Sequence, residues 1–275
     1  MSDAQKAYSF AAGLVRSHTP RHAGTRAARR AAEWIRERAA SLGLDAKIDS
    51  FSAAAPDGSR EFANVVAEIH GTGGASAQWI VFISHFDTYV RAGAGFEGAN
   101  DGASTTGLLL ALAESIHRAG RPRLNIAFIW TDGEEARHSY SENDGFQGSK
   151  RAAAEFRRLG RVVKAAVNLD MLGDRDLHIE LPANATPSLN ALVVRAARDA
   201  GLSSIVSCSD KCISDDFSAF LAAGWPATDL IDFSYGPRNR WWHTPDDTLD
   251  KISVESLFKA GCLSAALFNL LSSNP

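Results

Sequence analysis

The sequence predicts an α/β fold: a single domain over residues 1–275, built as a three-layer α/β/α sandwich around a central mixed, mostly parallel sheet. Two observations support this prediction. Apolar strand-like segments alternate with helix-like segments from one end of the chain to the other, and neither an internal repeat nor a linker divides them. Strands that are apolar on both faces are typical of a sheet that helices cover on both sides.

The elements expected in the first part of the chain follow from residue spacing. A helix is expected over Ala4–Ser17, and a second over Thr25–Leu42, where apolar residues share one face and charged residues the other. Asn64–Ile69 and Trp79–Ser84 are apolar runs rich in β-branched residues, which predicts strands. Gly71–Ala77 between them is rich in glycine, alanine and serine, which predicts a turn.

The rest of the chain continues the alternation. Apolar runs predict three further strands, and apolar residues at helical spacing predict five further helices. In chain order these are the helix Ser104–Ala119, the strand Leu124–Trp130, the helix Phe146–Leu159, the strand Val162–Asp170, the helices Pro187–Ala200 and Asp216–Ala223, the strand Ala227–Ile231 and the helix Ser253–Leu271. The serine-rich segment Gly201–Ser214 is expected to be a loop.

Composition argues against several classes of protein. A net charge of −3 offers no basic footprint for nucleic acid. The longest apolar runs, such as Trp79–Ile83, are far shorter than the ~20 residues of a membrane span. Three cysteines, Cys208, Cys212 and Cys262, form neither a disulfide framework nor a four-cysteine zinc site, so a tightly held metal must use histidine and carboxylates. Cys208 and Cys212 could form a redox pair, although two ordinary thiols are the simpler interpretation.

The first residues of the chain bear on the compartment. Residues 1–18 lack the charged start, apolar core and small-residue cleavage site of a secretory signal, which favours the cytoplasm. A secreted or periplasmic chain that had been processed and restarted with Met would look the same. Nothing in the sequence indicates an oligomeric state.

Residue types that bind metals follow four of the predicted strands, from Trp79–Ser84 onward. In a parallel sheet the carboxyl ends of the strands meet at one edge, where ligands bind. In strand order these residues are His85 and Asp87, then Glu134 and Glu135, then Asp170, and finally Asp229, Asp232 and His243. Asp101 adds a carboxylate from the loop Gly98–Ser104, whose small residues permit unusual backbone geometry.

Each motif has a structural explanation when it is taken alone. His85 and His243 could be packed histidines, Asp101 or Ser104 could cap the following helix, and Glu134 with Glu135 could form a solvated acidic loop. Together they supply a set of two histidines and three carboxylates that suits two Zn²⁺ ions sharing one carboxylate. The members of this set are His85, Asp101, Glu135, Asp170 and His243.

Glu134 suits a different task from its neighbour. One of two adjacent acids can bind a metal while the other takes a proton from the metal-bound water as general base. Two other hydrolytic motifs are missing from the sequence. No nucleophile-elbow pattern surrounds a serine, and no His-Glu-x-x-His pattern is present.

These motifs resemble those of metallopeptidase family M28, the co-catalytic zinc aminopeptidases, together with their relatives the glutaminyl cyclases. The resemblance covers nearly the whole chain and implies the zinc exopeptidase fold. It is carried by His-Phe-Asp at 85–87, Gly-Ala-Asn-Asp-Gly-Ala-Ser at 98–104, Asp-Gly-Glu-Glu-Ala at 132–136, Gly-Ser-Lys at 148–150, Leu-Asp-Met-Leu-Gly at 169–173 and Trp-His-Thr-Pro-Asp-Asp-Thr at 242–248.

The resemblance implies a set of metal ligands. In the aminopeptidases, the residues that match His85 and Asp170 bind one zinc ion. The matches of Glu135 and His243 bind the second ion, and the match of Asp101 bridges both. In the cyclases, a single zinc ion is bound by the matches of Asp101, Glu135 and His243.

The resemblance also implies roles around the metal. Glu134 matches the general base, and Asp87 matches the acid behind the first histidine. Asp216 matches an acid that shares a hydrogen-bond network with the base. The bond between Asp101 and Gly102 matches a cis peptide bond of the family.

Features of both branches occur in the sequence. The insert Ala136–Phe146 and Trp242 before the second histidine are similar to the cyclases. Three residues differ from the usual pattern. Tyr140 replaces a tryptophan beside the substrate of animal cyclases, Phe217 replaces a histidine of both branches, and Asp229 replaces another histidine of animal cyclases.

We therefore expect a zinc-dependent metallohydrolase that acts on peptides with a free N-terminus. The main hypothesis is an aminopeptidase, in which a zinc-activated water attacks the first peptide bond. The alternative is a glutaminyl-peptide cyclotransferase that forms N-terminal pyroglutamate with one zinc ion, with Tyr140 and Trp242 walling the substrate pocket. A third hypothesis is a zinc-stabilised binding protein on an inactive peptidase fold.

Overall fold

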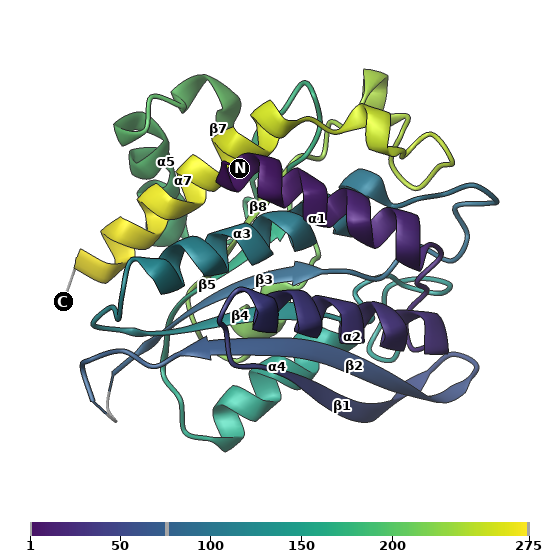
Figure 1. Ribbon diagram of the computed structural model, residues 1–275, viewed down its shortest axis with the longest axis horizontal. Helices are drawn as coiled ribbons and strands as arrows, with labels where there is room; N and C mark the ends of the chain where they lie inside the picture. The colour runs from purple at the N-terminus through teal and green to yellow at the C-terminus, as the bar shows by residue number, and fades with distance from the viewer. Residues whose placement is uncertain (1, 75–76, 274–275) are drawn as a thin grey trace.

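A mixed sheet runs through the middle of the protein, whose computed structural model describes residues 2–74 and 77–273 (Figure 1). Within these residues the sheet has eight strands, in the order β1-β2-β4-β3-β5-β8-β6-β7. Their bounds are β1 (Ala46–Ala55), β2 (Gly58–Ile69), β3 (Trp79–His85), β4 (Asn125–Thr131), β5 (Val163–Asp170), β6 (Ile179–Leu181), β7 (Val206–Cys208) and β8 (Ala227–Ile231).

The four central strands of the sheet, β4, β3, β5 and β8, run parallel to one another. The β1–β2 hairpin continues the sheet beyond β4 in antiparallel pairing, and β6 pairs with β8 in the same sense. Every residue of β3, β4 and β8 is buried, in agreement with their apolar sequences. The central strands therefore end at one edge of the sheet, and polar residues that follow them are brought together there.

Helices cover both faces of the sheet and complete the three-layer α/β/α sandwich that the sequence predicts. One face packs against α1, α2, α3, α5 and α7, and the opposite face packs against α4 and α6. Their bounds are α1 (Asp3–His18), α2 (Arg26–Ser41), α3 (Thr105–Arg118), α4 (Gln147–Arg158), α5 (Pro187–Asp199), α6 (Phe217–Ala222) and α7 (Val254–Ser273).

The main difference from the predicted elements is the hairpin at one edge of the sheet. β1 was not expected, and β2 begins at Gly58 rather than at Asn64. Alanine is the commonest residue of β1, and alanine, lysine and aspartate are depleted in strands, so its pairing with β2 is what holds it in the sheet. The expected loop Gly201–Ser214 contains β7, and the expected turn Gly71–Ala77 includes residues 75–76, which lie outside the described part.

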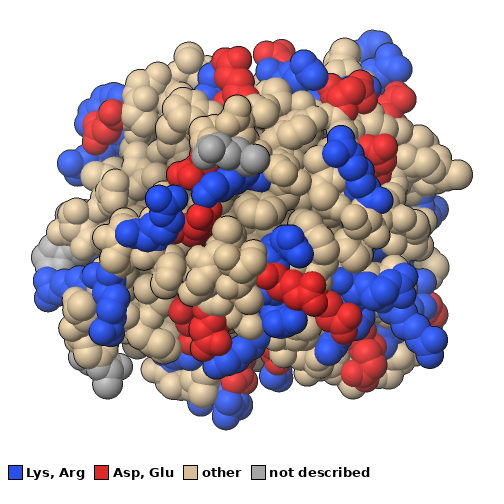
Figure 2. All heavy atoms as spheres, in the orientation of Figure 1, with Lys and Arg blue, Asp and Glu red and all other residues tan. Residues whose placement is uncertain are grey.

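α7 is the one described helix with the length and hydropathy of a membrane span. Seven of its twenty residues are buried, and it packs against α1, α3 and α5. A core helix of a folded domain has the same composition, so this observation is weak evidence for a membrane. Charged side chains of both signs are interspersed across the face of the molecule shown in Figure 2.

Candidate active site

The five predicted metal ligands meet at the carboxyl ends of the central strands. His85 is the last residue of β3 and Asp170 the last of β5. Glu135 follows β4, Asp101 lies in the tight turn before α3, and His243 lies in the loop after β8. They form two groups whose potential ligand atoms lie within 4.8 Å of one another, and both groups include Asp101.

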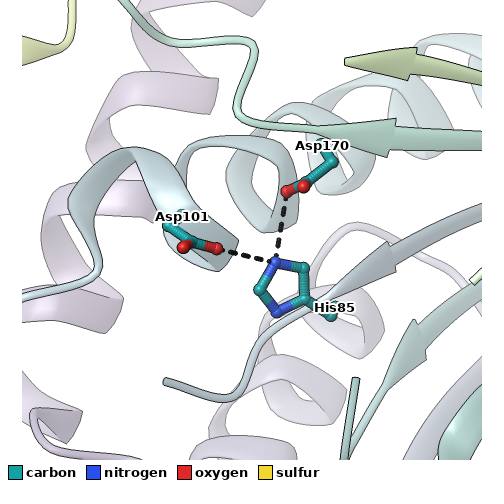
Figure 3. Close-up of side chains that lie close together, drawn as sticks. All are labelled: His85, Asp101 and Asp170. Carbon is teal, nitrogen blue, oxygen red and sulfur yellow. Dashed lines mark hydrogen bonds and ion pairs between the residues drawn. The ribbon is translucent and has the colours of Figure 1, made fainter. Parts of the chain in front are cut away.

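The first group consists of His85, Asp101 and Asp170, all of them buried (Figure 3). The Nε2 atom of His85 lies 3.1 Å from Oδ1 of Asp101 and 3.2 Å from Oδ1 of Asp170. Although burial opposes the charged imidazole, contacts with the two carboxylates raise the pKa of His85 well above its usual value. One imidazole nitrogen thus faces two acids at nearly equal distances.

The second group consists of Asp101, Glu135 and His243. The Nε2 atom of His243 lies 3.3 Å from Oδ2 of Asp101 and 3.2 Å from Oε2 of Glu135. Burial and the charge of Asp101 raise the pKa of Glu135 to about 7. The His243 ring stacks between two aromatic rings, with centroids 3.9 Å from Tyr89 and 4.1 Å from Trp242.

The separations within both groups fit a zinc ion. Zinc–ligand bonds of about 2.0–2.1 Å in a tetrahedron place neighbouring donor atoms about 3.3 Å apart. The nitrogen–oxygen separations here are 3.1–3.3 Å. Because the donors are imidazole nitrogens and carboxylate oxygens, both groups have the chemistry of a zinc site.

Asp101 is presented by a tight segment of small residues, Ala99–Ser104. Gly102 within it has a φ of 92°, which L-residues rarely adopt. A Cβ on Gly98 would lie 2.8 Å from the carbonyl oxygen of Asp101, so only glycine fits there. The prediction of a cis peptide bond between Asp101 and Gly102 is wrong. That bond is trans, and Thr19–Pro20 is the one cis peptide bond among the described residues. The chain instead reverses through the dihedral angles of these two residues.

Two buried charged residues hold this segment, and the sequence motifs did not assign either of them a role. Asp247 accepts the backbone N–H of Asn100 at 2.8 Å and that of Asp101 at 3.1 Å. Arg21 donates to the carbonyl oxygens of Glu97 at 2.9 Å and Gly98 at 2.7 Å. Burial lowers the pKa of Arg21 to about 10, and nearby carboxylates oppose that shift, so the guanidinium remains charged at neutral pH.

Asp87 anchors the loop that follows β4. Its carboxylate accepts the backbone N–H groups of Gly133, Glu134 and Glu135 at 3.1–3.2 Å. Its Oδ1 lies 3.7 Å from Nδ1 of His85, which is an ion-pair separation and too long for a hydrogen bond. The structure therefore shows Asp87 as the support of the Glu134–Glu135 pair as well as a neighbour of His85.

Glu134 is buried beside the metal ligands. Burial and the charge of Glu135 raise the pKa of Glu134 well above its usual value, as is common for a catalytic base. The Tyr140 hydroxyl donates to Oε1 of Glu134 at 3.3 Å and lies 3.5 Å from Oε2 of Glu135. The Tyr140 ring stacks on Phe146 with centroids 4.7 Å apart, which orients the hydroxyl toward the two glutamates.

Three further aspartates are buried behind the site. Asp216 accepts the Thr131 hydroxyl at 2.5 Å, and burial raises its pKa to about 6. Its neighbour Asp215 lines the cavity, and Asp229 is fully buried. Asp215, which sequence reasoning missed, thus comes nearer to the open space than Asp216. The catalytic role of Asp216 stays a prediction.

A cavity of about 330 Å³ opens beside the two metal groups. Tyr140 and Trp242, the predicted pocket residues, both line it, together with Asp101, Glu134 and His243. Its volume lies in the range of small-ligand sites. The site can therefore hold the end of a peptide against a metal ion with a base beside it.

Comparison with known proteins gives consistent matches over most of the chain. The profile of peptidase family M28 matches residues 64–268. A glutaminyl-peptide cyclotransferase of Drosophila melanogaster is 27% identical over 260 residues, which cover 85% of this chain and 72% of that protein. The crystal structure of an Acidobacteriales bacterium glutaminyl cyclase is 32% identical, with a TM-score of 0.90 over 98% of this chain and 94% of that one.

A structure named a leucine aminopeptidase precursor also shares the fold. This protein, from Bacteroides thetaiotaomicron, has 22% sequence identity and a TM-score of 0.85, and the match covers 99% of this chain and 97% of that chain. The resemblance in fold therefore extends to proteins named for both activities, whereas the relatives above with higher identity are named for cyclisation.

Proposed function

The chain belongs to peptidase family M28, and from this premise we propose that it is a glutaminyl cyclase, which closes the N-terminal glutamine of a peptide into pyroglutamate. The observation that carries the proposal is the match to a glutaminyl cyclase structure at 32% identity over 98% of this chain. It favours the alternative of the sequence analysis over an aminopeptidase. We further propose that residues 1–275 form one catalytic domain.

The reaction needs a proton to move between two nitrogen atoms of the substrate. The α-amino nitrogen attacks the side-chain amide carbon, a new carbon–nitrogen bond forms, and the old one breaks to release ammonia. Glu134 takes the proton from the α-amine and gives it to the leaving nitrogen. Burial raises the pKa of Glu134, which makes its carboxylate a stronger proton acceptor than an exposed glutamate.

The group Asp101, Glu135 and His243 would hold a zinc ion, and its donor chemistry and separations fit one. Bound there, zinc would polarise the amide carbonyl of the substrate. The residues of the chain do the remaining work. Asp87 fixes the backbone of both glutamates, and Trp242 and Tyr140 wall the cavity around the glutamine side chain.

An aminopeptidase is the second candidate, because one specific feature supports it. The group His85, Asp101 and Asp170 is as complete as the other, and a second zinc ion there would give the two-metal arrangement of a hydrolase. In a cyclase that uses one ion, His85 would instead hold Asp101 in place through their contact of 3.1 Å, with Asp170 on the same imidazole nitrogen.

The two candidates differ in product and in metal content. Purified protein with Zn²⁺ is incubated with peptides that begin with glutamine and with matched peptides that begin with leucine or alanine. A cyclase releases ammonia from the glutamine peptides, leaves them shorter by one ammonia in mass, and leaves the others intact. Release of the first residue from the other peptides, with two zinc ions per chain, would assign an aminopeptidase instead.

A further inference from the structure

Lys211 is an exposed residue that lines the catalytic cavity. Apart from His243, Tyr140 and Cys212, the other ionisable side chains that line this cavity carry carboxyl groups. They are Asp101, Glu134, Asp170, Glu180 and Asp215. No hydrogen bond or ion pair joins the Lys211 ammonium to any described residue, so this cation is available to a ligand.

The backbone around Lys211 is held firmly against the end of β6. The carbonyl oxygen of Lys211 accepts the N–H of Ala183 at 2.9 Å. Ile213 exchanges two hydrogen bonds with the side chain of Asn184, at 2.8 and 2.9 Å. The neighbouring Ser209 donates its N–H to Leu181. Lys211 therefore projects from an anchored segment, which lowers the entropic cost of using it to bind a ligand.

The metal groups and Lys211 contribute to the same cavity wall. A substrate whose N-terminal glutamine lies against Glu134 and His243 must direct the rest of its chain toward the remaining lining residues. Glu180 is among them, and its carboxylate already accepts the hydroxyl of Ser234 at 3.2 Å. Lys211 is thus the one lysine or arginine among the described residues that line the cavity.

We propose that Lys211 binds a carboxylate near the N-terminus of the substrate, so that the enzyme prefers short glutaminyl peptides with a free C-terminus. The inference rests on the proposed function and names its substrate class. Without Lys211, the carboxylate of Glu180 would repel such a peptide. An acidic side chain at the second or third position would supply the same chemistry as a free C-terminus.

The test compares each peptide with its C-terminal amide. The series Gln-Ala, Gln-Ala-Ala and Gln-Ala-Ala-Ala is prepared as free acid and as amide, and kcat/KM for ammonia release is measured with Zn²⁺-loaded enzyme. An exposed ion pair contributes about 0.2–1 kcal/mol, so we expect the acid to react up to about five-fold faster at one or more lengths. A Gln-Glu amide and a Gln-Gln amide form a further pair that separates a side-chain carboxylate from a terminal one.

Variants of Lys211 identify the residue responsible. Lys211→Met should bring the ratio of acid to amide to one or below, and Lys211→Arg should keep it above one. Lys47→Met is the matched control, because Lys47 is exposed on β1 and does not line this cavity. A ratio of one in the unaltered enzyme at every length, or a ratio that Lys211→Met leaves unchanged, would overturn the inference.

Binding measurements keep the inference separate from the proposed function. The same acid and amide pairs are titrated by calorimetry into Zn²⁺-loaded Glu134→Gln protein, with and without Lys211→Met. A tighter Kd for the acid that depends on Lys211 supports the inference even if no ammonia is released, and equal values for acid and amide contradict it. Absence of ammonia release from every glutaminyl peptide would overturn only the proposed cyclase activity.

Discussion

Asp247 accepts the backbone N–H of Asp101 at 3.1 Å, so the carboxylate shared by both candidate metal groups is tied to the loop that carries His243. Its other oxygen accepts the N–H of Asn100 at 2.8 Å and the Tyr235 hydroxyl at 2.6 Å. Asp247 stands four residues after His243 in the sequence. One buried side chain therefore fixes the positions of two proposed ligands relative to each other.

This relationship predicts that Asp247→Asn weakens zinc binding although Asp247 is not itself a member of either metal group. The asparagine amide group cannot accept both backbone N–H groups, so the segment that presents Asp101 loses a hydrogen bond. Substitution of residues that orient metal ligands commonly weakens metal binding about 10- to 100-fold. Competition with a chromogenic chelator measures the zinc Kd of the variant and of the unaltered protein.

The neighbouring acid provides the matched control. Asp246 is exposed, with its carboxylate 3.5 Å from Arg240, and Asp246→Asn should leave the zinc Kd unchanged. Circular dichroism of each metal-free variant checks that it is folded. Equal zinc affinity in Asp247→Asn and in the control would contradict the positioning role of Asp247.

Glu134→Gln should abolish most of the activity and leave zinc binding intact. The amide cannot take up a proton, and removal of a general base typically costs about 10²–10⁴-fold in rate. Glutamine keeps the size of the side chain and the backbone N–H that Asp87 accepts at 3.2 Å. Ammonia release gives the rate, and mass spectrometry of the metal gives the zinc content. Activity above a tenth of normal would remove Glu134 from the role of base.

Tyr140→Phe tests whether the hydroxyl at the base matters apart from the aromatic ring. The substitution removes the hydrogen bond of 3.3 Å to Glu134 and keeps the ring that stacks on Phe146. Hydrogen bonds to charged groups contribute about 1.5–3 kcal/mol, and partial exposure of Tyr140 reduces this value, so we expect a loss of about three- to ten-fold in kcat/KM. Tyr8→Phe, in a helix remote from the cavity, should react normally. Unchanged kinetics in Tyr140→Phe would limit this residue to packing.

The location of the site could be predicted from the sequence for a simple physical reason. Apolar runs in the sequence predict the buried strands β3, β4 and β5. Because these strands are parallel, the residues that follow them lie at the same edge of the sheet. His85, Glu135 and Asp170 were located in this way, and the structure brings them together with Asp101 and His243.

The supporting residues could not be predicted because their partners are main-chain atoms of distant segments. Arg21 contacts carbonyl groups more than 60 positions away, and nothing in its local sequence marks that contact. The choice between Asp215 and Asp216 depends on where α6 begins, which is at Phe217. The start of a short helix decides which of two adjacent acids faces the cavity, and sequence patterns do not resolve a boundary to one residue.

Asp229 is a buried acid near another acid, Asp170, and both burial and this neighbour disfavour its ionised form. It is fully buried on β8 and accepts Nδ2 of Asn168 at 3.1 Å. Its second oxygen has no hydrogen-bond partner. Burial and the charge of Asp170 raise the pKa of Asp229 to about 8. The folded protein therefore holds this carboxyl group in its neutral form at a pH where the unfolded chain ionises it.

The sign of the resulting pH dependence follows from linkage. Because the pKa of Asp229 in the folded state, about 8, lies above the ordinary aspartate value of 3.8, the protonated form stabilises the fold. As pH rises from about 4 to about 8 the unfolded chain loses this proton and the folded chain keeps it, so the free energy of unfolding falls by about 1.4 kcal/mol per pH unit. Above about pH 8 the loss levels off.

Asp229→Asn should flatten this decline in the metal-free protein, because asparagine stays neutral at every pH and keeps an oxygen for Asn168. Urea unfolding in EDTA at pH 5 and at pH 8 gives the free energy of unfolding for each protein. We expect the variant to exceed the unaltered protein at pH 8 by at least about 1 kcal/mol more than at pH 5. Asp210→Asn, at an exposed position, should show the same change in the free energy of unfolding between pH 5 and pH 8 as the unaltered protein. If Asp229→Asn shows that same change too, Asp229 is ionised in the folded state. Its neighbours, rather than a bound proton, would then stabilise the buried group.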